Sequence, residues 1–441
     1  MKPLKNSKIV SLCNTIYKSI CFHDFFKSHF PTFLKIYLHF NCKKQNKYLK
    51  SVKQKSKIKV VFLFQTPAVW KYDRLYYLLD KDDAFEPTVV IVPYNVSLFY
   101  DMQETIRIVE QSEEFAKNKN YNYLSAFDAQ NKKWLDVKKI LDPDVVFFAK
   151  PYKDTFPQYH IYNFADRLTC YAPYGFFISK RFRENSNFPF HNLLWKFFAE
   201  TQYQQDLSKI NAVNKGKNVI ITGCLPMENV MRTDYVPANV WKKQGYPKKR
   251  IIWAPHHTID YLFNFSNFMV YAEPMLELAE KFKDNVQFAF KPHPVLKFRL
   301  INLWGTEKTE DYYQRWANLS NAQLETGDYI DLFRTSDAMI HDSGSFLLEY
   351  LHLPQNPILY LVRDRANLYT SLNEFSSQAV DLHYHAENLE QIEHFIQDVV
   401  INGNDPMKAQ REQFFKDYLY PKDGIMPSQK IMNILKKELG K

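Results

Sequence analysis

Short apolar runs alternate along the chain with longer segments in which apolar residues recur at helical spacing. In the first half these runs fall at 59–64, 88–92, 144–148 and 218–222, and each stops at polar residues, proline or glycine. Buried strands that alternate with helices are typical of a parallel sheet. The pattern therefore predicts an α/β unit that starts near residue 58.

A second set of apolar runs follows a stretch rich in lysine and proline at 236–249. These runs fall at 250–254, 286–290, 337–340 and 357–361. Two α/β halves joined by a linker indicate an α/β fold of the GT-B type, with two Rossmann-like domains that face a cleft. We expect a basic amphipathic helical extension at 1–57, an acceptor domain at 58–235 and a nucleotide-donor domain at 248–441.

The basic residues are concentrated at the N-terminus. Residues 1–57 contain 13 Lys and one Asp, so the remaining 384 residues carry 45 of the 58 basic groups and 47 of the 48 acidic groups. A nearly neutral body argues against nucleic-acid binding, which requires a basic surface on the folded domain. Lys18, Asp24 and Lys27 interrupt the apolar residues, so the sequence predicts neither a transmembrane helix nor a signal peptide.

The N-terminal extension has two interpretations. Two short amphipathic helices that flank Pro31, followed by a polybasic run from Lys43 to Lys57, would bind an anionic membrane surface. The alternative is a helical extension that packs on the body and leaves its lysines in solvent. The five cysteines are widely spaced without a CxxC, which favours a reducing compartment. We therefore expect a cytoplasmic protein, peripheral at the inner face of the cell membrane.

The segment 337–349 is the strongest candidate for a ligand site. A short strand leads directly into Asp342, Ser343, Gly344 and Ser345, and an apolar helix is expected to begin at Phe346. The first backbone N–H groups of such a helix would bind a diphosphate, and the glycine would let a phosphate approach the backbone. Glu349 follows Ser345 by one helical turn and would accept hydrogen bonds from a ribose diol. The alternative is an ordinary capped helix with a solvated glutamate.

Two further strand ends carry basic side chains. Lys291 and His293 each precede a proline at the end of one strand, and both would donate to phosphate oxygens of a leaving group. His256 and His257 end the preceding strand, where either would contact phosphate or act as acid or base. Because adjacent histidines point differently and no third ligand follows at metal spacing, we expect no metal.

The acceptor side is less well defined by the sequence. Tyr174 and Gly175 follow an apolar run, and Gln65 and Trp70 follow the first predicted strand. We expect these residues at strand ends of the acceptor domain. Two Asp-x-Asp matches lie in a turn or before a strand, which indicates turn chemistry. GxGxxG, Walker A and HExxH are lacking, so we expect no cofactor, and the histidines at 383, 385 and 394 are expected on the surface.

These residues resemble the CDP-glycerol glycerophosphotransferase family, whose members build teichoic acids and related capsule polymers. The resemblance covers 250–365. The apolar Ala-Pro strand end that closes at Pro255, the segment Phe290 to Pro294, and the pattern from Asp331 to Tyr350 are similar to the family's motifs. The resemblance implies that the cytidine diphosphate portion of the donor is bound by His293, Ser343, Ser345 and Glu349.

The sequence also departs from that family. Its Asp-Ser-Gly turn is closer to UDP-N-acetylglucosamine 2-epimerases and some capsule glycosyltransferases, and the family's tryptophan–histidine–glycine loop is replaced by residues 174–176. The leading hypothesis is transfer of glycerol phosphate, or a related polyol phosphate, from CDP-glycerol or another nucleotide-activated donor to a polyol-phosphate or saccharide acceptor. The alternatives are a nucleotide-sugar glycosyltransferase, a 2-epimerase-like enzyme and a non-catalytic capsule-assembly protein.

Overall fold

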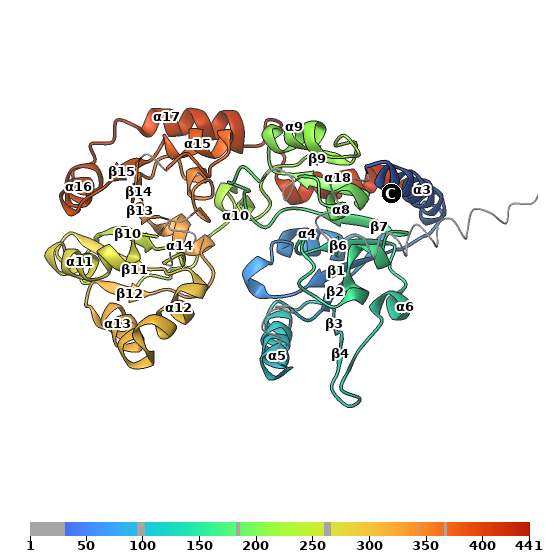
Figure 1. Cartoon of the computed structure of the whole chain (residues 1–441), viewed down its shortest axis with the longest axis horizontal. Helices are drawn as coiled ribbons and strands as arrows, with labels where there is room; N and C mark the ends of the chain where they lie inside the picture. The colour runs from blue at the N-terminus through green and yellow to red at the C-terminus, as the bar shows by residue number, and fades with distance from the viewer. Residues whose placement is uncertain (1–30, 95–101, 182–185, 260–265, 343, 366–367) are drawn as a thin grey trace, which may run out of the picture. The chain divides into compact units, whose positions relative to one another are not determined.

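The structure is a computed structural model of the chain, and it describes residues 31–94, 102–181, 186–259, 266–342, 344–365 and 368–441. The described chain divides into two compact units, which are treated separately below. The first unit comprises residues 1–174, 181–226 and 423–441, and the second comprises 175–180 and 227–422. Each unit contains one parallel sheet with its own buried core (Figure 1).

The sheet of the first unit has seven parallel strands in the order β3-β2-β1-β6-β7-β8-β9. The main helices and strands of this unit are α3 (Pro31–Val52), β1 (Ile58–Phe64), α4 (Asp73–Asp80), β2 (Phe85–Ile91), α5 (Met102–Asn118), β3 (Tyr123–Ser125), α6 (Val137–Leu141), β6 (Val145–Phe148), β7 (Leu168–Tyr171), α8 (Pro189–Leu193), β8 (Lys196–Ala199), α9 (Gln202–Asn211), β9 (Val219–Ile221) and α18 (Pro427–Leu439). Short elements complete it: η1 (Pro67–Val69), the hairpin β4 (Phe127–Asp128) and β5 (Lys133–Trp134), η2 (Pro157–Tyr159) and η3 (Ile161–Asn163).

The sheet of the second unit has six parallel strands in the order β12-β11-β10-β13-β14-β15. Its elements are α10 (Glu228–Met231), β10 (Lys249–Ala254), α11 (Phe268–Lys281), β11 (Val286–Phe290), α12 (Pro294–Trp304), α13 (Thr306–Asn318), β12 (Ala322–Leu324), α14 (Ile330–Thr335), β13 (Ala338–His341), η4 (Tyr350–His352), β14 (Ile358–Leu361), α15 (Glu374–Val380), β15 (Tyr384–Ala386), α16 (Leu389–His394), the π-helix η5 (Phe395–Ile401), α17 (Lys408–Phe414) and the π-helix η6 (Phe415–Leu419).

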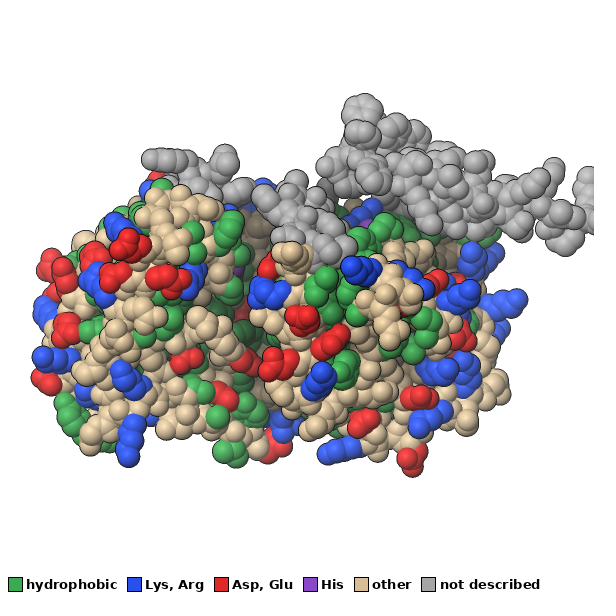
Figure 2. Space-filling view, turned by 90° about the horizontal axis from the view of Figure 1, so that it is seen from below, with side chains coloured by type: hydrophobic (Ala, Val, Ile, Leu, Met, Phe, Trp, Pro, Cys, Tyr) green, Lys and Arg blue, Asp and Glu red, His purple; other side chains and the backbone are tan. Residues whose placement is uncertain are grey.

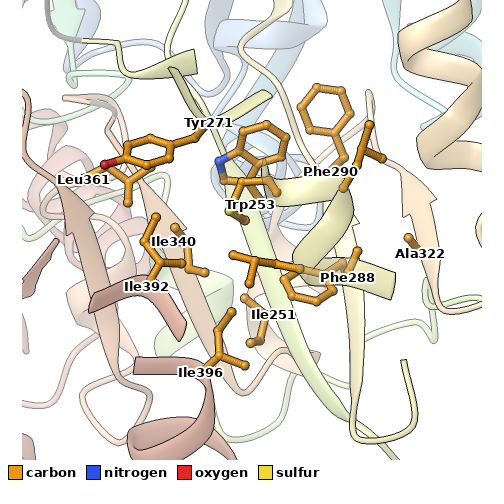
Figure 3. Close-up of a cluster of buried hydrophobic side chains, with 14 of the residues drawn as sticks. Ile251, Trp253, Tyr271, Phe288, Phe290, Ala322, Ile340, Leu361, Ile392 and Ile396 are labelled. Atoms are coloured by element: carbon orange, nitrogen blue, oxygen red, sulfur yellow. The ribbon is translucent and has the colours of Figure 1, made fainter. Parts of the chain in front are cut away.

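Aromatic stacking between neighbouring strands holds both cores. In the first unit Phe62 of β1 stacks on Phe147 of β6, with ring centroids 4.8 Å apart. In the second, Trp253 of β10 stacks on Phe290 of β11 at 5.0 Å, and Ile392 and Ile396 close the same cluster (Figure 3). Offset ring pairs of this kind add to the free energy gained from burying their area. The eight apolar runs of the sequence thus form strands, as predicted.

The unit boundaries differ from the domains expected at 58–235 and 248–441. The chain passes into the second unit at Met227, and its last 19 residues, 423–441, return to the first unit. Helix α18 packs against α4 (Figure 1), and its Ile431 and Leu435 are fully buried in the first core. Amphipathic spacing marks an apolar face on a helix but does not say which sheet covers that face.

Most of the described part of the N-terminal extension is helical. Helix α3, described from Pro31 to Val52, contains the lysines at 43, 44, 47 and 50. Tyr37, Gln45 and Val52 are buried on the first unit, whereas those four lysines are exposed. Residues 31–52 therefore agree with the alternative in which the extension packs on the body and leaves its lysines in solvent. The helix expected before Pro31 lies outside the described residues. None of the described helices is long and apolar enough to cross a membrane.

Acidic and basic side chains are interspersed on the face shown in Figure 2. Figure 2 shows Lys and Arg side chains beside Asp and Glu side chains over the face in view. This mixture agrees with the nearly balanced charge of residues 58–441.

Candidate functional site

The predicted donor residues meet where the strand order of the second sheet reverses. Strands β10 and β13 are neighbours, with Ala254 paired to His341, and the chain leaves them toward opposite sides of the sheet. In open parallel sheets ligands bind at such a reversal, beyond the carboxyl ends of the strands. The loop after β10 carries Pro255, His256 and His257, and the loop after β13 carries Asp342 and Gly344. Ser343 lies outside the described residues.

Asp342 fastens the two loops together. Its side chain is fully buried, and its Oδ1 accepts a hydrogen bond from the backbone N–H of His256 at 2.6 Å. Its Oδ2 accepts from the hydroxyl of Ser266 at 3.1 Å and from the backbone N–H of Asn267. Burial raises the pKa of this carboxyl to about 6, against the effect of these three hydrogen bonds. Asp342 therefore has a positioning role, because its hydrogen bonds hold the loop that carries His256 beside the turn.

Three histidines form a cluster at the ends of β10 and β11. The ring centroids of His256 and His257 are 4.2 Å apart, those of His257 and His293 are also 4.2 Å apart, and those of His256 and His293 are 5.2 Å apart. Burial lowers the pKa of both His256 and His293 to about 3, and their positive neighbours, including Arg299, add to this shift. The sequence predicted His256, His257 and His293 as separate contacts, and the structure brings them together.

Their hydrogen bonds suit an anion better than a metal cation. One ligand nitrogen from each histidine lies within 4.8 Å of those of the other two, which is close enough for a metal site to be considered. However, Nδ1 of His293 accepts from the backbone N–H of Val295 at 3.2 Å, so its neutral ring carries the proton on Nε2. Metal-bound histidines instead donate their other N–H to a carboxylate or carbonyl. His293 is the N-cap residue of α12, and Arg299 of the same helix adds positive charge near it. The Nε2–H of His293 is therefore placed to donate to a phosphate oxygen.

Lys291 is held apart from the histidines. It is 7% exposed, and its Nζ donates to the carbonyl oxygen of Gly327 at 2.6 Å. Burial lowers its pKa, while the carboxylates of Glu325 and Asp328 oppose that shift. In the structure this ammonium group therefore stabilises the loop after β12. Its predicted contact with a leaving phosphate stays a prediction.

The expected helix after Ser345 does not form. Residues 344–349 are turns, and only Tyr350–His352 form a single 3₁₀ turn, η4. Residues 347–354 are all buried, so this stretch lacks the solvent-exposed face of an amphipathic helix. Ser345 is exposed at the turn, and Glu349 precedes η4 directly. The prediction of a regular helix after Ser345 is therefore wrong, and an anion site made by the start of that helix is not present in this form.

Glu349 is covered by the segment Gly175–Lys180, which we call the strap. Its Oε1 accepts a hydrogen bond from the backbone N–H of Phe176 at 3.1 Å. The side chain is 4% exposed, and within the described residues its Oε2 has no hydrogen-bond partner. Burial raises the pKa of Glu349 to about 8. The carboxyl group predicted to meet a ribose diol thus lies under the strap.

The strap is bound to the second unit along its length. The backbone N–H of Asn373 donates to the carbonyl of Ile178 at 2.8 Å, and its Nδ2 donates to that of Phe177 at 2.6 Å. A side chain on Gly344 would overlap Ile178 Cδ1, so this glycine allows the strap to lie on the turn. Gly175, predicted on the acceptor side, belongs to the second unit, whereas Tyr174 belongs to the first.

Of the other acceptor-side residues, Gln65 and Tyr174 follow strands of the first unit, whereas Trp70 follows the 3₁₀ helix η1, and their contact with an acceptor stays a prediction. Gln65 follows β1, and its Nε2 donates to Asp154 at 2.8 Å. Trp70 packs into the aromatic core, and its Nε1 donates to Asp73 at 2.6 Å. Burial raises the pKa of Tyr174 above its usual range, and a hydrogen bond with Tyr152 adds to this.

Sequence reasoning missed two lysines beside these residues. Lys71 is 8% exposed, lies 5.9 Å from the ring centroid of Tyr174, and donates to the carbonyl of Ala149 at 2.5 Å. Lys150 follows β6 directly and pairs with Asp154 at 3.1 Å. The position of Lys150 at a strand end was visible in the sequence, but the burial of Lys71 depends on packing.

One surface expectation is wrong. His383 is fully buried against His341, with Nδ1 and Nε2 of the two rings 3.3 Å apart. His385 is half-buried, and His394 alone of the three is well exposed.

Comparison with known proteins gives a likeness in structure. No family model and no curated protein matches the sequence. The fold is similar to S. aureus MnaA bound to UDP, with a TM-score of 0.55 and 15% identity over 87% of this chain and 97% of that one. A UDP-GlcNAc 2-epimerase from Neisseria meningitidis bound to UDP-GlcNAc has a TM-score of 0.53 and 15% identity, over 86% of this chain and 99% of that one.

A variant of the wall teichoic acid polymerase TagF, soaked with CDPG, is also similar. Its TM-score is 0.55 at 12% identity, over 91% of this chain and 94% of that one. At these identities the likeness defines the fold. The chain has a GT-B-like fold. Of its two Rossmann-like units, the second carries the described residues predicted for a donor, and the first carries those predicted for an acceptor except Gly175.

Proposed function

We propose that the protein transfers glycerol phosphate, or a related polyol phosphate, from a CDP-activated donor to a hydroxyl group of a cell-surface glycopolymer or lipid-linked acceptor. The proposal depends on one observation above all, the cluster of His256, His257 and His293 at the strand reversal of the second sheet. Nε2–H of His293 would donate to the donor's diphosphate, and Arg299 would add positive charge. This support from the residues agrees with the resemblance of 250–365 to glycerophosphotransferases.

The transfer would proceed by attack on phosphorus. The acceptor's hydroxyl oxygen bonds to the donor's β-phosphorus, the bond from that phosphorus to the bridging oxygen breaks, and CMP leaves. The hydroxyl proton passes to a base, for which Tyr174, His256 and His257 are the candidates. Burial keeps the His256 ring neutral at pH 7, but the same low pKa makes it a weak base, so this ring is better suited to hydrogen-bonding the acceptor than to removing its proton. Hydrogen bonds from the histidine cluster would stabilise the charge that develops on the leaving CMP.

A nucleotide-sugar enzyme is the second candidate. The Asp-Ser-Gly spelling of 342–344 favours it, and attack would then occur at the anomeric carbon with loss of the nucleotide. A 2-epimerase would use the same fold without a separate acceptor. A non-catalytic capsule-assembly protein would bind the nucleotide and not turn it over.

Binding of nucleotides separates these candidates. Saturation-transfer NMR with CMP, CDP-glycerol, UDP and UDP-GlcNAc should show preferential binding of the cytidine compounds, whereas preference for uridine would contradict the CDP-donor proposal. His293→Leu should weaken binding at least tenfold, because a hydrogen bond to a charged phosphate is lost. His394→Leu, which changes an exposed histidine of the same unit, is the matched control and should leave affinity unchanged. Release of CMP with an acceptor present would distinguish an enzyme from a binding protein.

We also propose that the protein works at the inner face of the cell membrane. The exposed lysines of α3 at 43, 44, 47 and 50 support electrostatic attraction to anionic lipids.

A further inference from the structure

The first unit has a strand reversal of its own. Strands β1 and β6 are neighbours, and the chain leaves β1 toward β2 on one side but reaches β6 only after building β2 and β3. The loops after β1 and β6 therefore diverge at the carboxyl edge of the sheet, where open parallel sheets bind ligands. The residues predicted for a donor lie in the other unit, whereas Gln65, predicted on the acceptor side, follows β1 at this reversal.

A cavity of about 250 Å³ lies at this reversal. Its floor consists of the ends of three adjacent strands, at Leu63, Val92 and Phe148. The walls come from η2, η3 and the start of α8, and they contribute mainly aromatic and aliphatic side chains: Tyr159, Ile161, Tyr162, Phe188, Pro189 and Phe190. A cavity lined in this way favours an apolar ligand body over a sugar, whose hydroxyl groups would lose their hydrogen bonds to water.

Basic side chains also line the cavity. Lys150 and Lys153 line it, and Lys150 lies 4.0 Å from the ring centroid of Tyr94 while pairing with Asp154. Lys153 is exposed and lies 5.1 Å from the ring centroid of Tyr162. One acidic group therefore faces two ammonium groups, which leaves positive charge for the anionic group of a ligand.

We propose that this cavity binds an anionic amphiphile, with a hydrocarbon segment among the aromatic rings and a phosphate or carboxylate group at Lys150 and Lys153. The inference rests on the proposed function for the role of its ligand, because Gln65, predicted on the acceptor side, also lines this cavity and a lipid-linked acceptor would carry a hydrocarbon segment. Nucleotide binding to the second unit is measured separately, so failure of one proposal is distinguishable from failure of the other. A planar aromatic ligand is the competing class, and the test below separates the two.

Isothermal titration calorimetry of the full chain with decyl phosphate, used below its aggregation concentration, tests the site. Decyl phosphate should bind at least tenfold more tightly than either decanol or inorganic phosphate, because each of these offers only half of the recognised chemistry. Tighter binding of phenyl phosphate than of decyl phosphate would overturn the hydrocarbon assignment. Absence of decyl phosphate binding would overturn the site itself.

Two variants locate the binding. Val92→Phe places a ring in the cavity and should weaken decyl phosphate at least tenfold, with the unfolding midpoint measured on the same sample. Lys153→Met changes an exposed residue and should weaken decyl phosphate but not decanol, and this variant keeps the test open if Val92→Phe fails to fold. Lys217→Met, at another exposed lysine of the first unit, is the control. Unchanged decyl phosphate affinity in Lys153→Met, or in folded Val92→Phe, would contradict the proposal.

Discussion

The backbone N–H of Phe176 donates a hydrogen bond to Oε1 of Glu349 at 3.1 Å, within the second unit. The same carboxyl group is the one that the sequence places near a donor's ribose. A ribose diol would therefore have to compete with the strap for Glu349, or reach its second oxygen, which is buried and unpaired within the described residues. This contact connects the predicted donor site to the backbone that follows Tyr174.

The buried carboxyl group of Glu349 should make stability depend on pH. Its pKa is about 8 in the folded chain and about 4.5 ordinarily, so the folded state holds the proton more strongly than the unfolded state. The stabilisation is complete below pH 4.5 and is lost as pH rises through 8, with a slope of up to about 1.4 kcal/mol per pH unit. The lowered pKa values of His256 and His293 give the opposite slope up to about pH 6.5, so the decline is measured as the difference between wild type and Glu349→Gln in urea denaturation at pH 5, 6.5 and 8. This difference should shrink as pH rises. Glu390→Gln, on the surface of α16, should retain the wild-type slope.

A side chain on Gly344 should require a shift of Ile178. Gly344→Ala would overlap Ile178 Cδ1, the end of a flexible side chain, so the cost in unfolding free energy should be that of a changed rotamer, about 0.5–1.5 kcal/mol. Ile178→Ala should relieve the cost in the double variant, so a double-mutant cycle should give a favourable coupling energy. Gly327→Ala has open space around its new Cβ and should change stability little. Additive effects of the two changes would show that strap and turn are not in contact.

Asp342 should be needed for the shape of the histidine loop. Asp342→Asn keeps the volume but replaces one acceptor oxygen with an NH₂ group, so at least one of the donors from His256, Ser266 and Asn267 loses its partner. An unsatisfied buried donor costs about 1–3 kcal/mol, and we expect a loss of at least this size in thermal or urea denaturation. Nucleotide affinity should fall as well, because the loop with His256 loses its fastening. Asp284→Asn, at an exposed position, is the control, and equal stability of the two variants would contradict the assignment.

The lysines of α3 should control binding to anionic vesicles. Deleting 1–57 would also remove the buried face of α3 and the ion pair of Lys55 with Asp144 at 2.6 Å, so charge reversal is the cleaner change. Lys43→Glu, Lys44→Glu and Lys47→Glu together should weaken binding to phosphatidylserine vesicles more than tenfold, since each basic residue near such a surface contributes about 1 kcal/mol. The same reversal at three exposed lysines of the second unit, Lys283, Lys308 and Lys408, should have a smaller effect. Equal losses in the two triple variants would argue against a specific membrane face on α3.

The positions of these strands, and of the polar residues at their ends, could be predicted because both are local properties of the sequence. An apolar run that ends in polar residues forms a buried strand wherever a sheet is built, so the eight strands and the positions of His256, His293 and Asp342 at strand ends follow from spacing alone. Parallel pairing then brings the ends of β10, β11 and β13 together. The sequence by itself therefore determined the α/β class and the main members of the candidate donor site.

Only the tertiary structure decided which buried groups contact one another. The strap over Glu349, the fastening of two loops by Asp342, the docking of α18 on the first unit and the cavity beside Lys150 all join residues far apart in sequence. No local periodicity encodes such contacts, because they arise when the energy of burying whole faces selects one packing among many. For the same reason the stretch after Gly344, which reads as the start of a helix, forms a turn whose residues from Leu347 onward are buried.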